Sequence, residues 1–318
     1  MKKVLITATN YETLCSDGLK MLRGYGCDVV TNRGSRMFTR DEMLASVGDI
    51  DGLIAHGETW DDELFDNAPN LKVIARFGVG YDSIDLDAAK RHGVYVTNCP
   101  GINSNAVAEM TVSLLMALIR EIPRLNKTQK AGIWSRTIFN ELPGKRIGVL
   151  GFGAIAQKTI KKLKGFKTDI LVYNRSLKTE LAESLGARIT TDLDEVLSTS
   201  DYILIHLPVA PETRNIINAE SIAKMKDGAY VINTARAPLV DSKAMYDALV
   251  SGKLRGYVTD VYNKEPADLN DPLFSLPNFI GTPHSSGETY ENYRDTGLAT
   301  AKAVIDVFEG REPWNRLV

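Results

Sequence analysis

Cysteine and histidine are scarce in this chain of 318 residues, which contains three cysteines and four histidines. Cys15, Cys27 and Cys99 form no CxxC pair, and their number is odd. Disulfide frameworks and most structural zinc sites need paired or closely spaced cysteines. We therefore expect neither a disulfide nor a bound metal.

Long apolar runs and an excess of charge of one sign are also missing. No run reaches the roughly 18 apolar residues that span a membrane. The first residues, MKKVLITATN, contain too few consecutive apolar residues for a signal peptide. The formal net charge is -2, and no long basic run offers a surface for nucleic acid. These absences predict a cytoplasmic protein that binds neither membranes nor nucleic acid.

The chain does contain a regular alternation of short, apolar, β-branched runs with longer segments of helical spacing. Helical spacing occurs, for example, at residues 17–25, 86–92 and 106–119. The strand-like runs are residues 4–8, 52–55, 71–75, 94–97, 146–150, 170–173, 202–207, 230–233 and 256–260. Strands that are apolar on both faces and alternate with helices are typical of parallel sheets. The length favours two domains, so we predict a two-domain α/β protein.

A glycine motif follows one of these predicted strands. Residues 146–157 read RIGVLGFGAIAQ, a strand that leads through Gly151 and Gly153 into a helix. In this context the motif is typical of a dinucleotide site, because the glycines allow a tight turn and a close approach of backbone to pyrophosphate. Ala156 replaces the third glycine and is small enough for close helix packing. The alternative is a glycine-rich turn that binds no ligand.

The residues after the next strand bear on the choice of cofactor. An NAD site usually has Asp or Glu there, whereas this chain has Asn174, Arg175 and Ser176. A guanidinium can bind a 2′-phosphate through paired hydrogen bonds, which a carboxylate would repel. The sequence therefore favours NADP(H). The alternative is NAD(H), with Asn174 bonded to the ribose and Arg175 solvated or stacked on adenine.

Several later motifs occur in a fixed order after the glycine loop. They read ARFGVGYDSID at 75–85, VAE at 107–109, HLPVAPETRN at 206–215, VINTARAPLVD at 231–241, DVYNKEP at 260–266 and TPH at 282–284. With these motifs the chain resembles the D-isomer-specific 2-hydroxyacid dehydrogenases over nearly its whole length. The resemblance implies a Rossmann-type cofactor domain at 100–286. It also implies a discontinuous, flavodoxin-like substrate domain formed by 1–99 and 287–318.

The same resemblance implies three catalytic residues, and the chemistry explains their types. Arg236 would bind the substrate carboxylate and polarise the carbonyl. His284 would be the acid/base, since histidine exchanges protons near neutral pH. Glu265 would hydrogen-bond the other imidazole nitrogen and favour the imidazolium. Of the other histidines, we expect His206 to be structural.

Further contacts are implied by the resemblance. Asp260 is expected beside the nicotinamide carboxamide and Thr111 beside the cofactor. The full set of expected cofactor contacts is Gly151, Gly153, Ala154, Ile155, Asn174, Arg175, Ser176, Leu207, Pro208, Thr111, Thr234, Ala235 and Asp260. The expected substrate contacts are Gly78, Val79, Gly80 and His56. The apolar helix at 106–119 and the loop with Trp134 are expected to form a homodimer interface, as the resemblance implies; the alternative is that they pack only within the chain.

These expectations describe an oxidoreductase that moves a hydride between NAD(P)H and a small 2-oxo or 2-hydroxy acid. The phosphoglycerate dehydrogenase branch usually has Arg-Ser-x-Thr where this chain has His56-Gly57-Glu58-Thr59. Neutral His56 is a weaker phosphate ligand and Glu58 would repel a dianion, so hydroxypyruvate or glyoxylate is an equal candidate. The alternative function is a non-catalytic, dinucleotide-sensing protein like the corepressors of the family. Such a sensor would not need Arg236, Glu265 and His284 together.

Overall fold

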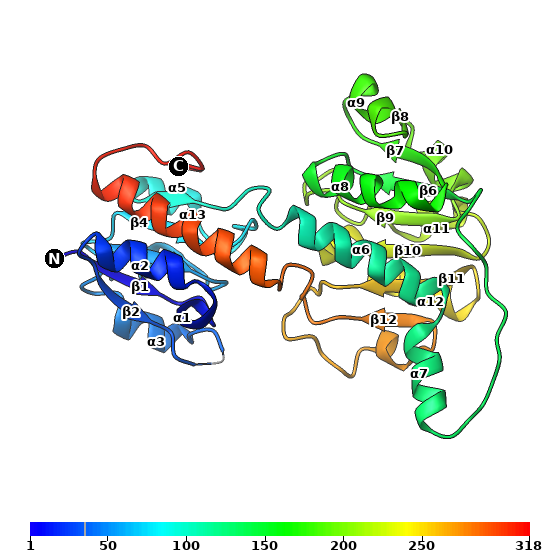
Figure 1. Ribbon diagram of the computed structural model, residues 1–318, viewed down its shortest axis with the longest axis horizontal. Coiled ribbons are helices and arrows are strands. Elements are labelled where there is room, and N and C mark those ends of the chain that lie inside the picture. Colours follow the sequence, from blue (N-terminus) through cyan, green and yellow to red (C-terminus); the bar gives the residue numbers. More distant parts are fainter. Residues whose placement is uncertain (35) are drawn as a thin grey trace. The chain divides into compact units, whose positions relative to one another are not determined.

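The computed structural model describes residues 1–34 and 36–318, which divide into two units by their contacts. Unit 1 consists of Met1–Asn103 and Glu288–Val318, and unit 2 consists of Ser104–Gly287. The divisions therefore follow residues 103 and 287, where we expected them after residues 99 and 286. Each unit is built on one parallel sheet, so the predicted α/β class is confirmed (Figure 1).

Unit 1 contains a five-stranded sheet in the order β2-β1-β3-β4-β5. All of its paired strands are parallel. The flavodoxin-like doubly wound fold has this order, with its ligand site where the order reverses, between β1 and β3. The strands are β1 (Lys3–Ile6), β2 (Asp28–Thr31), β3 (Gly52–Ala55), β4 (Val73–Arg76) and β5 (Tyr95–Thr97).

Helices cover both faces of this sheet. They are α1 (Tyr11–Leu14), α2 (Ser16–Gly24), α3 (Arg40–Ser46), α4 (Asp62–Asp66), α5 (Leu86–Arg91) and α13 (Tyr290–Phe308). Leu5 and Leu53 face one core with α3, α4 and α5, whereas Val4 and Ile6 face the other core with α2 and α13. In the latter, a Cβ on Gly18 would lie 2.4 Å from the carbonyl oxygen of Gly297. Glycine therefore permits the close approach of α2 and α13, which lie side by side in Figure 1.

Unit 2 contains a seven-stranded parallel sheet in the order β12-β11-β10-β9-β6-β7-β8. Counted from β6, this is the Rossmann order with one added edge strand, and it reverses between β6 and β9. The strands are β6 (Arg146–Leu150), β7 (Asp169–Tyr173), β8 (Arg188–Thr190), β9 (Tyr202–Ile205), β10 (Ala229–Asn233), β11 (Leu254–Thr259) and β12 (Phe279–Gly281).

Two layers of helices enclose the central strands of this sheet. One core contains Leu115 from α6 and Ile160 from α8, and the other contains Val196 and Met245 from α10 and α12. The helices are α6 (Ser104–Ile119), α7 (Ile122–Lys130), α8 (Ala154–Leu163), α9 (Thr179–Ser184), α10 (Leu193–Thr199), α11 (Ala219–Lys224) and α12 (Ser242–Val250), with 3₁₀ turns η1 (Lys164–Phe166), η2 (Ala237–Leu239) and η3 (Pro272–Ser275). No helix in the described part of the chain is long and apolar enough to cross a membrane.

Three edge strands, β2, β8 and β12, were not expected from the sequence. Each has only three or four residues, and none of those residues is buried. Edge strands can carry polar residues on their open side, so they lack the continuous apolar run that marks a central strand. The sequence pattern therefore predicts the inner strands of both sheets and, among the edge strands, only β5.

Candidate active site

The glycine loop lies at the end of β6, where the strand order of unit 2 reverses. Gly151 has φ +98°, and a Cβ there would lie 2.6 Å from the backbone carbonyl oxygen of His206. A Cβ on Gly153 would meet nothing within 4 Å, and the ten-residue helix α8 begins at the next residue. An open approach to the amino end of a helix suits a pyrophosphate, because the first amides of the helix lack intrahelical partners.

The turn after β7 is held by Asn174. Its Nδ2 donates to the backbone oxygen of Ser176 at 2.7 Å and to the hydroxyl at 3.1 Å. Arg175 and Lys178 are exposed, and within the described residues Arg175 has no hydrogen-bond or ion-pair partner. The turn thus presents two cations to solvent, with no carboxylate at its tip.

His284 and Glu265, which come from segments after β12 and β11, form a pair. His284 Nδ1 lies 2.8 Å from Glu265 Oε2, and the Glu265 Oε1 atom accepts a hydrogen bond from the amide of Tyr262 at 3.1 Å. Burial raises the pKa of Glu265, but the hydrogen bond and charge of His284, the Tyr262 amide and the charge of Arg236 outweigh it. The pKa of Glu265 therefore lies below its ordinary value, and the carboxylate is charged at neutral pH.

Asp260, directly after β11, holds the segment that carries His284. It is 1% exposed and accepts hydrogen bonds from the Thr282 hydroxyl at 2.6 Å and from the amides of Ser285 and Ser286 at 2.9 and 2.8 Å. These donors lie on both sides of His284, which has φ +51°, a left-handed conformation that a non-glycine residue adopts only when its surroundings enforce it. Asp260 therefore fixes the backbone of the acid/base candidate.

Arg236 follows β10 and is positioned by a buried asparagine. Asn233 donates from Nδ2 to the backbone oxygen of Arg236 at 2.9 Å and accepts from the amide of Ala235 at 3.0 Å. The Arg236 guanidinium donates to the Ala235 oxygen at 2.8 Å, and its charge acts on Glu265. Sequence reasoning missed Asn233, although a polar residue ending an otherwise apolar strand is a readable sign.

Two of the expected cofactor contacts, Thr111 and Thr234, are joined by a hydrogen bond. The hydroxyls of Thr111 on α6 and Thr234 after β10 lie 2.8 Å apart, and Thr111 also bonds the Val107 oxygen. Both residues are buried, so their hydroxyls tie α6 to the end of β10. Leu207 is buried as well, and the Pro208 oxygen accepts a hydrogen bond from Thr213 at 2.7 Å.

His206 contrasts with His284. It follows β9, and both of its ring nitrogens are buried without a hydrogen-bond partner among the described residues. Burial lowers the pKa of His206 to about 4. The imidazole is therefore neutral at neutral pH. The His206 backbone lies against the glycine loop, where its amide donates to the Leu150 oxygen at 2.8 Å.

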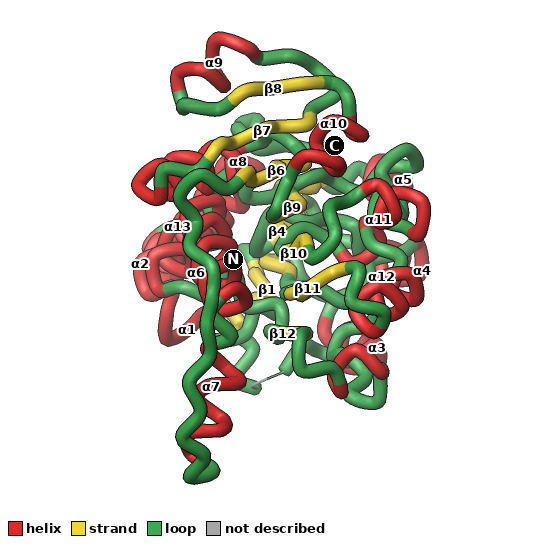
Figure 2. The backbone as a smooth tube through the Cα atoms, turned by 90° about the vertical axis from the view of Figure 1, so that its right-hand side faces the viewer, coloured by secondary structure: helices red, strands yellow, loops and turns green. Residues whose placement is uncertain are grey.

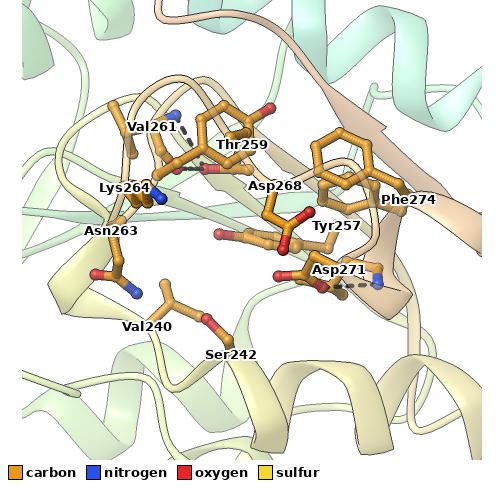
Figure 3. Close-up of a pocket in the computed structure, with 15 residues that line it drawn as sticks. Val240, Ser242, Tyr257, Thr259, Val261, Asn263, Lys264, Asp268, Asp271 and Phe274 are labelled. Carbon is orange, nitrogen blue, oxygen red and sulfur yellow. Dashed lines mark hydrogen bonds between the residues drawn. The ribbon is translucent and has the colours of Figure 1, made fainter.

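A cavity of about 190 Å³ is lined by residues that precede and follow Glu265 in the chain. Tyr262, Asn263 and Lys264 form part of its wall, and Figure 3 shows the carboxylates of Asp268 and Asp271 directed toward the same space. Tyr262 stacks on Phe274 with ring centroids 5.9 Å apart. The segment that carries Glu265 thus has a stacked aromatic pair on one of its residues and a cavity beside it.

The expected substrate contacts of unit 1 follow neighbouring strands. His56 follows β3, and residues 78–80 follow β4, so both lie at the carboxyl edge of the sheet. Gly78 has φ +141°, and Asn98 Nδ2 donates to the Val79 oxygen at 2.8 Å. Glu58, which we expected to repel a substrate phosphate, is 7% exposed. It accepts hydrogen bonds from the Thr7 hydroxyl and from the amide of His56.

Comparison with known proteins identifies the family. A model described as "D-isomer specific 2-hydroxyacid dehydrogenase, NAD binding domain" matches residues 112–286. The chain belongs to the D-isomer specific 2-hydroxyacid dehydrogenase family. The resemblance seen in the sequence motifs is therefore confirmed.

Its relatives carry two different activities in their names. D-3-phosphoglycerate dehydrogenase of Methanocaldococcus jannaschii is 38% identical over 98% of this chain and 58% of its own length. Glyoxylate reductase of Thermofilum pendens is also 38% identical, over 93% of this chain and 89% of its own. A crystal structure from Thermus thermophilus matches with a TM-score of 0.91 and 34% identity, over 99% of this chain and all of that one. The chain thus spans little more than half the length of the phosphoglycerate dehydrogenases it matches.

Proposed function

We propose that this chain transfers a hydride between a nicotinamide dinucleotide and a small 2-oxo or 2-hydroxy acid. The observation that carries the proposal is the 2.8 Å hydrogen bond between His284 Nδ1 and Glu265 Oε2, in a member of this family. A histidine paired with a charged carboxylate is suited to proton transfer. Its place after β12 is at the same carboxyl edge of the sheet as the glycine loop after β6.

The glycine loop, Arg236, His284 and Glu265 would each have a separate role in the hydride transfer. Gly151, Gly153 and the first turn of α8 would hold the pyrophosphate of a dinucleotide, whose nicotinamide supplies or accepts the hydride. Arg236 would bind the substrate carboxylate and polarise the carbonyl. His284 would donate its Nε2 proton to the developing alkoxide during reduction and take it back during oxidation. Glu265 would keep the other proton on Nδ1 and stabilise the imidazolium.

Arg236 provides the direct test of this assignment. We expect Arg236→Ala to bind cofactor normally but to lose most turnover of hydroxypyruvate, glyoxylate and 3-phosphohydroxypyruvate, whereas Arg236→Lys keeps a charge but not the paired hydrogen bonds and recovers part of the rate. Steady-state oxidation of the reduced cofactor and a fluorescence titration measure the two properties. A dinucleotide sensor would show binding without turnover in the wild type as well.

We also propose that NADP(H) is the preferred cofactor, because Arg175 and Lys178 are exposed cations beside a turn that lacks a carboxylate. We expect Arg175→Ala to weaken NADPH binding by about 1.5–3 kcal/mol, the range for hydrogen bonds to charged groups. NADH, which lacks the 2′-phosphate, is the internal control and should be barely affected. Equal losses for both cofactors would contradict the assignment.

A homodimer is proposed on the exposed apolar side chains that follow α6. Ile122, Ile133, Trp134 and Ile138 are all exposed, with Trp134 at 82%, and α7 with its loop stands away from the sheet in Figure 2. Apolar patches of this kind mark interaction surfaces. Trp134→Ala with Ile138→Ala should lower the mass measured by light scattering, while Leu269→Ala, an equally exposed apolar residue elsewhere in unit 2, should leave it unchanged.

A further inference from the structure

Tyr262 adjoins both of the segments that carry the paired side chains of Glu265 and His284. Its backbone amide donates to Glu265 Oε1 at 3.1 Å, so the backbone of Tyr262 holds the carboxylate. Its hydroxyl reaches strand β12, because a Cβ placed on Gly281 would lie 2.6 Å from that oxygen. Gly281 ends β12, and His284 follows three residues later. One residue thus borders both partners of the pair, with its backbone on one side and its ring on the other.

A set of aromatic contacts holds the ring of Tyr262 against the same strand. The ring stacks on Phe274, with an angle of 20° between the ring planes. Phe274 in turn packs edge-on against Phe279, with ring centroids 5.3 Å apart. Both arrangements are favoured ones for aromatic pairs. Since Phe279 and Gly281 are the first and last residues of β12, the ring of Tyr262 is tied to both ends of this short strand.

Glycine at position 281 is required for this arrangement. The 2.6 Å between its ideal Cβ and the Tyr262 hydroxyl is far shorter than the about 3.5 Å at which non-bonded heavy atoms attract each other. The same Cβ would lie 3.0 Å from Phe274 and 3.3 Å from Phe279. Gly281 is not among the residues with positive φ, so the requirement is one of space and not of backbone conformation. A glycine within a strand often marks such a close approach.

The segment between Tyr262 and Glu265 borders the cavity of about 190 Å³, which Tyr262, Asn263 and Lys264 help to line. Protein interiors are otherwise close-packed, and close packing is what holds most buried segments in place. On the side of the cavity this segment lacks such support. The position of the Tyr262 backbone, and of the carboxylate that its amide holds, therefore depends on where the ring is fixed.

We infer that Tyr262 is a positioning residue, which sets the distance between Glu265 and His284 through the contact of its ring with Gly281. The inference rests on the proposed function. A displaced ring would draw the Tyr262 amide, and Glu265 with it, away from His284 Nδ1. The carboxylate would then stabilise the imidazolium less. Burial raises the pKa of Tyr262 to about 12, so its hydroxyl stays neutral at the pH values where histidine exchanges protons.

The test adds the missing methyl group with Gly281→Ala. We expect kcat for the reduction of hydroxypyruvate to fall by about 10- to 100-fold, since a misplacement of about 1 Å can cost about 10²-fold. The alkaline limb of kcat/KM should move to lower pH, in the same direction as in Glu265→Gln. Gly165→Ala is the matched control in the same unit, because a Cβ there would meet nothing within 4 Å. It should change neither the rate nor the limb.

Substitutions of Tyr262 separate this contact from a general disturbance of β12. Tyr262→Phe keeps the stacked ring but lacks the hydroxyl, so alone it should leave the alkaline limb in place. Combined with Gly281→Ala, it should recover most of the lost rate, because the oxygen nearest the new methyl group is gone. Tyr262→Leu removes the stacked ring and should shift the limb, which keeps the test open if Gly281→Ala does not fold. The NMR signal of the His284 Nδ1 proton, which a hydrogen bond to a carboxylate moves downfield, should follow the limb in each variant.

The outcomes distinguish a failure of this inference from a failure of the proposed function. An unshifted limb in Gly281→Ala or in Tyr262→Leu overturns the inference and leaves the proposed function standing. A double variant as impaired as Gly281→Ala alone does the same, because the effect would then come from β12 itself. A wild type that reduces no 2-oxo acid with either cofactor overturns the proposed function, and the inference falls with it.

Discussion

Two strand ends of the same seven-stranded sheet carry histidines, yet their surroundings are opposite. His206 follows β9, with both ring nitrogens buried and unpartnered among the described residues, and burial lowers its pKa to about 4. His284 follows β12, is 47% exposed at the side chain, and has Glu265 2.8 Å from Nδ1. Position at the carboxyl edge is shared. Under the proposed function, access to solvent and a charged partner suit His284 to proton transfer, and their absence makes His206 unsuited to it.

The largest expected effect is on kcat, for which variants of the two histidines should differ most. His284→Gln should lower kcat for reduction of a 2-oxo acid by about 10² to 10⁴, the usual contribution of a general acid. His206→Leu should lower it less than about tenfold, because a neutral, buried ring supplies no proton. Steady-state oxidation of NADPH with hydroxypyruvate measures both. A comparable loss of kcat in the two variants would show that the charged partner Glu265 does not distinguish the role of His284 from that of His206.

The second effect concerns stability and belongs to His206 alone. Its folded pKa of about 4 lies below the unfolded value of about 6.5, so between these values the unfolded chain binds a proton that the folded chain excludes. The free energy of unfolding should therefore fall as pH drops from about 6.5 to about 4, by up to about 3 kcal/mol from this residue. Denaturant unfolding across this range measures the slope, and His206→Leu should flatten it. An unchanged slope would mean that the ring is already protonated, or solvated, in the folded state.

The sequence predicted only part of what distinguishes the surroundings of His284 from those of His206. The alternation of apolar runs predicted the parallel sheets, and the family resemblance carried by the motifs after the glycine loop implied Arg236, Glu265 and His284. The bonds from Asp260 to Thr282, Ser285 and Ser286 could not be read, because they join residues more than 20 positions apart through a loop. The hydrogen bond of Glu58 to Thr7 was hidden for a similar reason, since Thr7 follows β1, a different strand.

A variant of Asp260 tests whether the backbone around His284, rather than its ring alone, is required. In Asp260→Asn one carboxylate oxygen becomes an amino group, which cannot accept a hydrogen bond. Either the Ser286 amide on Oδ2 or the Thr282 hydroxyl and Ser285 amide on Oδ1 therefore lose their acceptor. We expect a loss of about 1.5–3 kcal/mol in the free energy of unfolding, the cost for hydrogen bonds to a charged group, and a lower kcat. The pH dependence of the remaining activity should keep its shape, because the pair of His284 with Glu265 is intact. A changed cofactor affinity with unchanged stability would assign Asp260 to the nicotinamide instead.

The smallest expected effect removes the charge beside His284 and leaves its backbone alone. The pKa of Glu265 lies below its ordinary value, so the carboxylate is charged above that range, and its bond to a protonated His284 is lost only as pH falls through the lowered value. Reduction needs the protonated ring. In Glu265→Gln a neutral amide replaces the charge that would stabilise the imidazolium, so the alkaline limb of kcat/KM for reduction should move to lower pH.

The pH profile distinguishes this electrostatic effect from a loss of positioning. Glu265→Asp keeps the charge but shortens the side chain, so it should lower the rate at every pH while leaving the alkaline limb in place. If Glu265→Gln also lowers the rate evenly at every pH, the carboxylate only orients the ring. The proposal expects the alkaline limb to shift in Glu265→Gln and to stay in place in Glu265→Asp. That result would mean that the charge of Glu265 distinguishes His284, after β12, from His206, after β9.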